Sequence, residues 1–223
     1  MKFYKSIFFI FLVCISSLQA QVNQYNEDGT RQGLWQKNFE DTNQIRYIGQ
    51  FNKGIEVGEF RFFKKGFPNM PTAIKIFSEN GTKADVTFYT QRGNVICKGV
   101  ERNKKREGKW VYYHRDGKKV MVEENYVNGK QEGEQITYYE NGVISETVSY
   151  VNGQKHGKEL VYSVKGVLIK EFTYVNGLLE GVNKFYSGRG YVTIEGMYKQ
   201  NKKIGVWNYY DANGKIIDQK RHK

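Results

Sequence analysis

The feature that most constrains this chain is an internal repeat of 24 to 25 residues. Tyr126-Val-Asn-Gly129, Tyr150-Val-Asn-Gly153 and Tyr174-Val-Asn-Gly177 carry one motif at a step of 24 residues. A second glycine follows each motif, and its anchor position can be traced through the chain at Gly33, Gly58, Lys83, Gly108, Gly133, Gly157, Gly181 and Gly205. Self-similarity at a fixed period is typical of repeat architectures. We therefore predict about eight copies of one small structural unit.

Each unit has the pattern of two strands joined by turns. Apolar and polar residues alternate with period 2, and Asn152-Gly153 is typical of a tight hairpin turn. The 24 glycines would interrupt any helix of useful length. The predicted fold class is all-β, an elongated antiparallel sheet of about eight stacked β-hairpins. The recurrent tyrosines and phenylalanines are expected to form an aromatic row on one face.

The anchor glycines are expected to adopt positive φ, which glycine tolerates without steric cost. Lys83 breaks this rule, and Pro68 and Pro71 lie shortly before it. We therefore predict a single repeat domain over residues 21–223 with an irregular repeat near residues 66–83.

The motif Tyr-x-Asn-Gly-x-x-x-Gly-x-x-x-x-Tyr runs from Tyr126 to Tyr138, from Tyr150 to Tyr162 and from Tyr174 to Tyr186. It resembles the MORN repeat in its bacterial variant form, clearly from Gly108 onward and more weakly before it. The resemblance implies an elongated sheet of stacked hairpins. Members of the family mostly serve as scaffolds, and bacterial relatives are often labelled YwqK-like antitoxin components.

Residues 1–20 have the pattern of a cleaved secretory signal. Lys2 and Lys5 precede a short apolar run, and Ala20 supplies the small residue expected at a cleavage site. The run is too short to cross a bilayer, so we expect no transmembrane segment in the mature chain. The predicted location is periplasmic, associated with the outer envelope, or secreted.

The chain is basic, with 35 Lys plus Arg against 23 Asp plus Glu. Removing Lys2 and Lys5 with the signal leaves 33 against 23, a net charge of +10. Anionic lipid, acidic polysaccharide and acidic proteins are compatible partners, and export makes nucleic acid the least expected one. Cys14 lies within the signal, so Cys97 is alone in the mature chain and is expected to be a buried apolar residue.

No group of residues predicts catalysis. The three histidines, His114, His156 and His222, have no neighbouring nucleophile in sequence, and the glycine spacing is structural. Glu123, Glu171 and Glu195 recur at equivalent positions, where cross-strand ion pairs with lysines are the favoured interpretation. We therefore expect a non-enzymatic protein without cofactor or metal.

Two features are candidates for partner binding. The basic run containing Arg102, Lys104, Lys105 and Arg106 occupies a turn where other copies have Asn-Gly, although charge runs of this kind are also common in solvated loops. Trp35, Trp110 and Trp207 stand two residues after an anchor, where an aromatic ring can serve either as a binding ledge or as a cap. Capping suits Trp207 in the last repeat, whereas Trp110 is the candidate contact.

These observations predict an exported protein-binding scaffold of the cell envelope. An antitoxin-like or immunity-like inhibitor of a toxic partner is one alternative. A surface protein that binds glycans or anionic lipids is the other.

Overall fold

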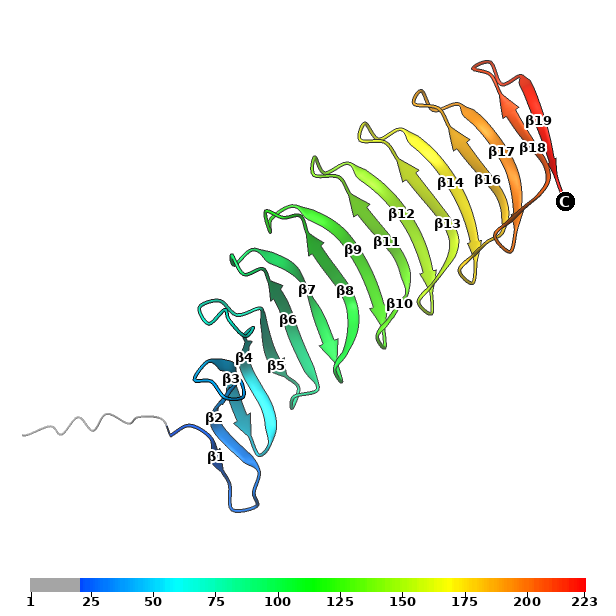
Figure 1. Ribbon diagram of the computed structural model, residues 1–223. Coiled ribbons are helices and arrows are strands. Elements are labelled where there is room, and N and C mark those ends of the chain that lie inside the picture. Colours follow the sequence, from blue (N-terminus) through cyan, green and yellow to red (C-terminus); the bar gives the residue numbers. More distant parts are fainter. Residues whose placement is uncertain (1–20) are drawn as a thin grey trace, which may run out of the picture.

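The computed structural model describes residues 21–223, and over this range the protein is all-β, without a helix (Figure 1). Nineteen strands form one long antiparallel sheet, which confirms the predicted fold class. The predicted signal peptide, residues 1–20, lies outside the described residues.

The strands of the first half are β1 (Gln24–Tyr25), β2 (Arg31–Asn38), β3 (Ile45–Asn52), β4 (Ile55–Phe62), β5 (Ala73–Ser78), β6 (Lys83–Tyr89), β7 (Val95–Arg102), β8 (Lys105–Tyr113) and β9 (Val120–Val127). Those of the second half are β10 (Lys130–Gln131), β11 (Gly133–Tyr138), β12 (Ile144–Val151), β13 (Gln154–Tyr162), β14 (Leu168–Val175), β15 (Leu178–Leu179), β16 (Gly181–Tyr186), β17 (Val192–Lys199), β18 (Lys202–Tyr210) and β19 (Ile216–His222).

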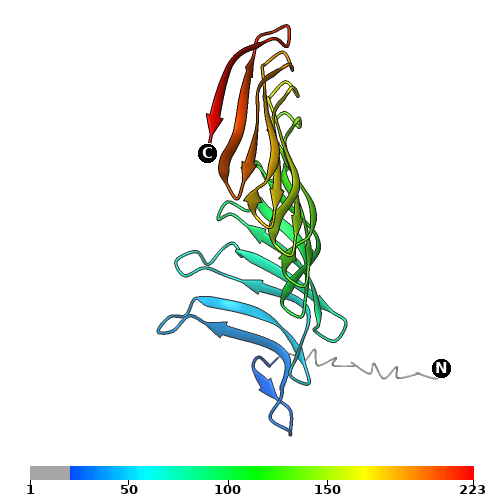
Figure 2. The same ribbon diagram turned by 90° about the vertical axis from the view of Figure 1, so that its right-hand side faces the viewer.

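The sheet is a meander in which hairpin follows hairpin along its length. The two-residue strands β10 and β15 are the short beginnings of segments that continue as β11 and β16. Within residues 21–223, β1 pairs only with β2 and β19 only with β18, so the sheet is open at both ends. Figure 2 shows that the strand direction turns along the sheet, so that the blue-to-cyan hairpins lie across the direction of the green-to-red ones.

The tight turns have the backbone geometry that their sequences predict. Asn152 and Gly153 have φ of 52° and 82°, and Asn176 and Gly177 have φ of 49° and 81°. Asn103 and Lys104, in the basic run, also have positive φ. Positive φ at both central residues gives a twist that matches the twist of the flanking strands.

The anchor glycines adopt positive φ as predicted, from 63° at Gly108 to 93° at Gly157. At Gly157 the ladder between β12 and β13 is interrupted, because Val148 pairs with Glu159 whereas Tyr150 pairs with Lys155. Three residues of β13, 156–158, therefore lie opposite Ser149 alone. A bulge of this kind bends the strand and increases its local twist.

The two faces of the sheet differ in burial. The inner face is defined here as the one that carries the buried apolar side chains, which are Phe51, Phe60, Ala73, Ala84, Val86, Cys97, Trp110, Val148 and Trp207. The opposite face is the outer face. Buried Cys97 agrees with the sequence prediction.

The expectation of one tyrosine row on one face is wrong. Tyr174 pairs with the anchor Gly157 on the inner face, whereas Tyr162 lies five residues beyond Gly157, an odd number, and therefore points to the outer face. The outer-row tyrosines Tyr138 and Tyr186 donate hydrogen bonds to Glu123 and Glu171 at 3.3 and 2.8 Å. The tyrosines thus form two rows on opposite faces.

Large inner side chains lie over glycines of the preceding strand. A Cβ on Gly49, Gly99 or Gly196 would lie 2.3, 2.4 or 2.1 Å from ring atoms of Phe60, Trp110 and Trp207, respectively. Trp207 also contacts Tyr198 and His222 edge-on, with ring centroids 5.1 and 6.1 Å away, which agrees with a cap on the last repeat. His222 also pairs with Gly205 at the end of β19, so this residue belongs to a paired strand.

The repeat with Lys83 departs from the others in register. The ladders of β4 with β5 and of β5 with β6 run without the bulge found in neighbouring hairpins. Consequently Lys75 pairs with Phe60, and Asp85, two residues after the anchor, is exposed while Ala84 and Val86 are buried. A shift of one residue transfers every side chain to the other face, which explains this exchange.

Replacing Gly99 by alanine tests the contact with Trp110. The added methyl group has no room, so we expect the free energy of unfolding to fall by about 1–3 kcal/mol, as in overpacked cores. Urea denaturation followed by tryptophan fluorescence measures this. Gly188→Ala is the matched control, because its Cβ would meet nothing within 4 Å, and an equal loss in both variants would contradict the packing argument.

Cys97 should react slowly with a polar maleimide in the folded protein. The thiol is buried, and burial raises its pKa, so little thiolate is present at neutral pH. Labelling followed by mass spectrometry should show a large rate increase in denaturant. Equal rates with and without denaturant would contradict the placement of Cys97 in the core.

Candidate partner-binding face

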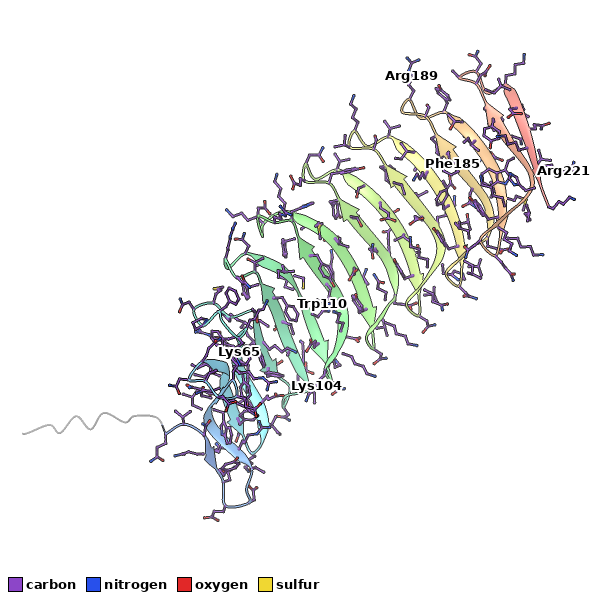
Figure 3. The ribbon with its side chains drawn as sticks, in the orientation of Figure 1. Lys65, Lys104, Trp110, Phe185, Arg189 and Arg221 are labelled. Carbon is purple, nitrogen blue, oxygen red and sulfur yellow. The ribbon has the colours of Figure 1, made fainter. Side chains whose placement is uncertain are left out.

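The structure buries the tryptophan that the sequence put forward as a contact. Trp110 is fully buried, so it offers no ring surface to a partner, and this prediction is corrected. Its indole nitrogen donates a hydrogen bond to the Val100 carbonyl at 3.0 Å, and the Arg106 guanidinium lies 4.3 Å from the ring centroid. Trp110 lies two residues after the anchor Gly108, and a side chain at this position points into the inner face. Figure 3 shows Trp110 midway along its hairpin and Lys104 at the turn.

The basic run does not act as one patch. Arg102 forms an ion pair with Glu79 at 2.6 Å, and Arg106 is directed onto the inner face against aromatic rings. Lys104 and Lys105 are exposed at the turn between β7 and β8. Of the four predicted basic residues, these two lysines are therefore placed to meet a partner in solution.

Arg106 begins a polar network on the inner face. Its guanidinium donates hydrogen bonds to the hydroxyl oxygens of Tyr112 and Tyr126, the latter at 2.9 Å. Tyr126 in turn donates to Glu124 at 2.6 Å, and Arg106 lies 3.8 Å from the same carboxylate. Burial, followed by the nearby Glu124 charge, raises the pKa of Tyr112, which stays a neutral phenol.

A second polar cluster lies two repeats further along the same face. Lys155 forms ion pairs with Glu159 and, at 3.9 Å, with Glu146, and Tyr174 donates a hydrogen bond to Glu159 at 2.9 Å. Glu159 is only 6% exposed. A buried carboxylate is tolerated when it is paired and hydrogen-bonded, as it is here.

The two carboxyl groups of this cluster have divergent pKa values. A hydrogen bond to Glu159, followed by burial, raises the pKa of Glu146 to about 7. Burial opposes ionisation of Glu159, but hydrogen bonds from Glu146, Lys155 and Tyr174 outweigh it and lower its pKa. At neutral pH Glu159 is therefore ionised, whereas Glu146 is present in both its protonated and its ionised form.

The polar stretch defined by these two clusters, here called the polar strip, is bounded by aromatic packing. On the N-terminal side Phe60 makes edge contact with both Phe51 and Phe77, and on the C-terminal side Trp207 packs beyond the strip. In the sequence, the position two residues after the anchor is aromatic toward both ends and is Gln135, Glu159 and Asn183 in the middle. That pattern was the available signal for the strip. Its placement on the buried face became clear only in the structure.

The outer face carries the predicted ladder of ion pairs. Lys109 pairs with Glu123 at 2.8 Å, Lys158 with Glu171 at 2.7 Å, and Lys184 with Glu195 at 3.4 Å. Each lysine side chain is at least about one-third exposed, so solvent screens the pairs and each contributes little to stability. The outer glutamates thus serve pairing between strands.

Scans of protein-family models and of curated proteins gave no match for this chain. In residues 21–223, three or more His, Cys, Asp or Glu side chains never gather closely enough to hold a metal ion. Over the same range there is no helix of the length and apolarity that crossing a membrane requires.

The raised pKa of Glu146 predicts a pH-dependent stability. Between its ordinary value of 4.5 and about 7, the folded chain keeps a proton that the unfolded chain has lost, so this contribution weakens as pH rises through that window. Glu146→Gln removes the ionisation. We expect the stability difference, variant minus wild type, to rise by about 1–2 kcal/mol from pH 5 to pH 8, a value reduced for partial exposure.

Urea denaturation at several pH values measures this difference. Glu140→Gln, in an exposed turn, is the control and should show a difference that does not change with pH. The pKa of Glu159 is lowered, so its contribution to the pH dependence of stability is confined to pH values below about 4.5. It therefore lies outside the window used for Glu146. If the stability difference between Glu146→Gln and wild type stayed constant with pH, the raised pKa of Glu146 would be contradicted.

Proposed function

We propose that this chain is an exported, non-enzymatic scaffold that binds a protein partner in the cell envelope. The observation that carries the proposal is the polar strip, in which charged and phenolic groups are held by mutual hydrogen bonds on one face of an open sheet. Groups held in this way lose little conformational freedom on binding, which favours specific association.

The form of the sheet supports a binding role. The described residues form one long sheet of similar hairpins, which offers an extended surface instead of one enclosed centre (Figure 1). The half-buried groups of the strip provide both donors and acceptors, and Lys104 and Lys105 add exposed positive charge beside it. An acidic segment of a partner protein would complement these lysines.

The repeated Tyr-x-Asn-Gly motif supports placing the chain among MORN-variant proteins, as part of the same proposal. The sequence of residues 1–20 supports export. Because a fold of this kind is compatible with many functions, the binding role rests on the arrangement of the strip and its lysines.

Crosslinked affinity capture from the envelope of the native cells tests the proposal. We expect wild-type protein to retain a stoichiometric protein partner and Lys104→Glu/Lys105→Glu to retain much less of it. Mass spectrometry identifies and quantifies what is captured. Capture of a toxic protein would assign the inhibitor role, whereas recovery of lipid or polysaccharide alone would overturn the scaffold proposal.

The matched control is Lys199→Glu/Lys202→Glu. These lysines flank the equivalent turn between β17 and β18, are exposed, and give the same change in net charge. Capture should be close to that of wild type. Equal losses in both double variants would show that net charge alone governs the association.

A further inference from the structure

A hollow of about 540 Å³ opens on the inner face at the irregular repeat. Its walls include Phe62, Phe77 and Phe88, and its floor includes Ala73 and Ala84. We propose that this hollow receives an aromatic side chain with a polar hydrogen, tryptophan or tyrosine, from the protein partner. The inference rests on the proposed function and names one contact by which the partner is recognised.

The register of the irregular repeat creates the hollow. In the flanking repeats, Phe60 and Trp110 fill the inner face, each over a glycine. Between them, the shifted register brings the small residues Ala73 and Ala84 inward and sends Asp85 outward. The irregular repeat therefore lacks a fully buried ring over a glycine of the kind that Phe60 and Trp110 provide in its neighbours.

The lining is suited to an aromatic guest. Phe77 already makes edge contact with Phe60 at 5.2 Å between centroids, the arrangement that aromatic rings prefer. The volume lies within the roughly 300–1,000 Å³ typical of ligand sites. A ring placed among Phe62, Phe77 and Phe88 would reproduce the packing that the chain builds around Trp110.

One end of the hollow is charged. Lys75 and Glu101 form an ion pair of 2.5 Å there, with side chains 22% and 16% exposed. The carboxylate oxygens can accept the hydrogen of an indole N–H or a phenol O–H. The chain satisfies its own buried indoles with an oxygen acceptor, since Trp110 and Trp207 donate to the Val100 and Met197 carbonyls. Glu56 and Lys104 also line the hollow.

The first test maps binding of a model compound. N-acetyl-tryptophanamide, titrated into ¹⁵N-labelled wild-type protein, should shift the amide signals of Ala73, Ala84 and their neighbours. N-acetyl-alaninamide is the control compound and should leave them unchanged. Absence of shifts, or shifts confined to other repeats, would overturn the proposal without any variant.

Filling the hollow should weaken this binding. Ala84→Leu or, independently, Ala73→Leu should weaken N-acetyl-tryptophanamide binding at least about tenfold, the equivalent of about 1.4 kcal/mol. Ala212→Leu, the same change in an exposed turn, should bind like wild type. The thermal melts and amide spectra of the variants establish that they are folded. Unchanged binding by a folded filled variant would overturn the assignment.

Capture experiments separate this inference from the scaffold proposal. A partner retained by wild type and lost by Ala84→Leu supports both. A partner retained equally by wild type and by Ala84→Leu overturns the proposed role of the hollow but is still compatible with the scaffold proposal. If wild type captures no protein, both the scaffold proposal and the proposal that the hollow receives a partner's side chain are overturned.

Discussion

The structure depends on how a single sheet buries a core without a second layer. Over residues 21–223, no helix or second sheet covers the inner face, yet Trp110 and Trp207 are fully buried. The bulges at the anchor glycines bend the strands, and the glycines of adjacent strands admit the large rings. Side chains of the same face, such as Arg106 over Trp110, then complete the cover. A side chain on a glycine beneath a ring would occupy the space of that ring, whereas a side chain on an anchor glycine would strain the positive φ found at the bulge.

The polar strip follows from the same arrangement. The position that holds a tryptophan in other repeats holds Glu159 here, and this carboxylate is only 6% exposed. Lys155 and Tyr174 supply the missing partners, so the carboxylate is retained at a modest cost in stability. A fully apolar strip would bury as much surface with less desolvation. Stability alone therefore does not account for the polar groups, and the proposed binding role would give them a use.

The irregular repeat shows how a local change of register alters a surface. The ladders around β5 lack the bulge, and Lys83 replaces the anchor glycine. Ala84 and Val86 therefore take inner positions and Asp85 an outer one, and a hollow lined in part by Ala73 and Ala84 opens on the inner face. In a repeat protein such a departure affects only its neighbours, because each unit contacts mainly the adjacent units. The same feature that weakens local packing thus provides a distinct place on an otherwise regular face.

The sequence by itself determined the fold class and the tight turns, because these depend on backbone conformations that Asn-Gly and single glycines favour locally. It also favoured cross-strand ion pairs between the recurrent glutamates and lysines, and the structure identifies Lys109 as the partner of Glu123. Only the tertiary structure decided which face is buried. That choice depends on the long-range register of the strands, which places Trp110 on the inner face, Tyr162 on the outer face and Arg106 against the inner aromatic rings. The polar strip and the hollow share this origin: both join residues of different repeats through a register that no single repeat specifies.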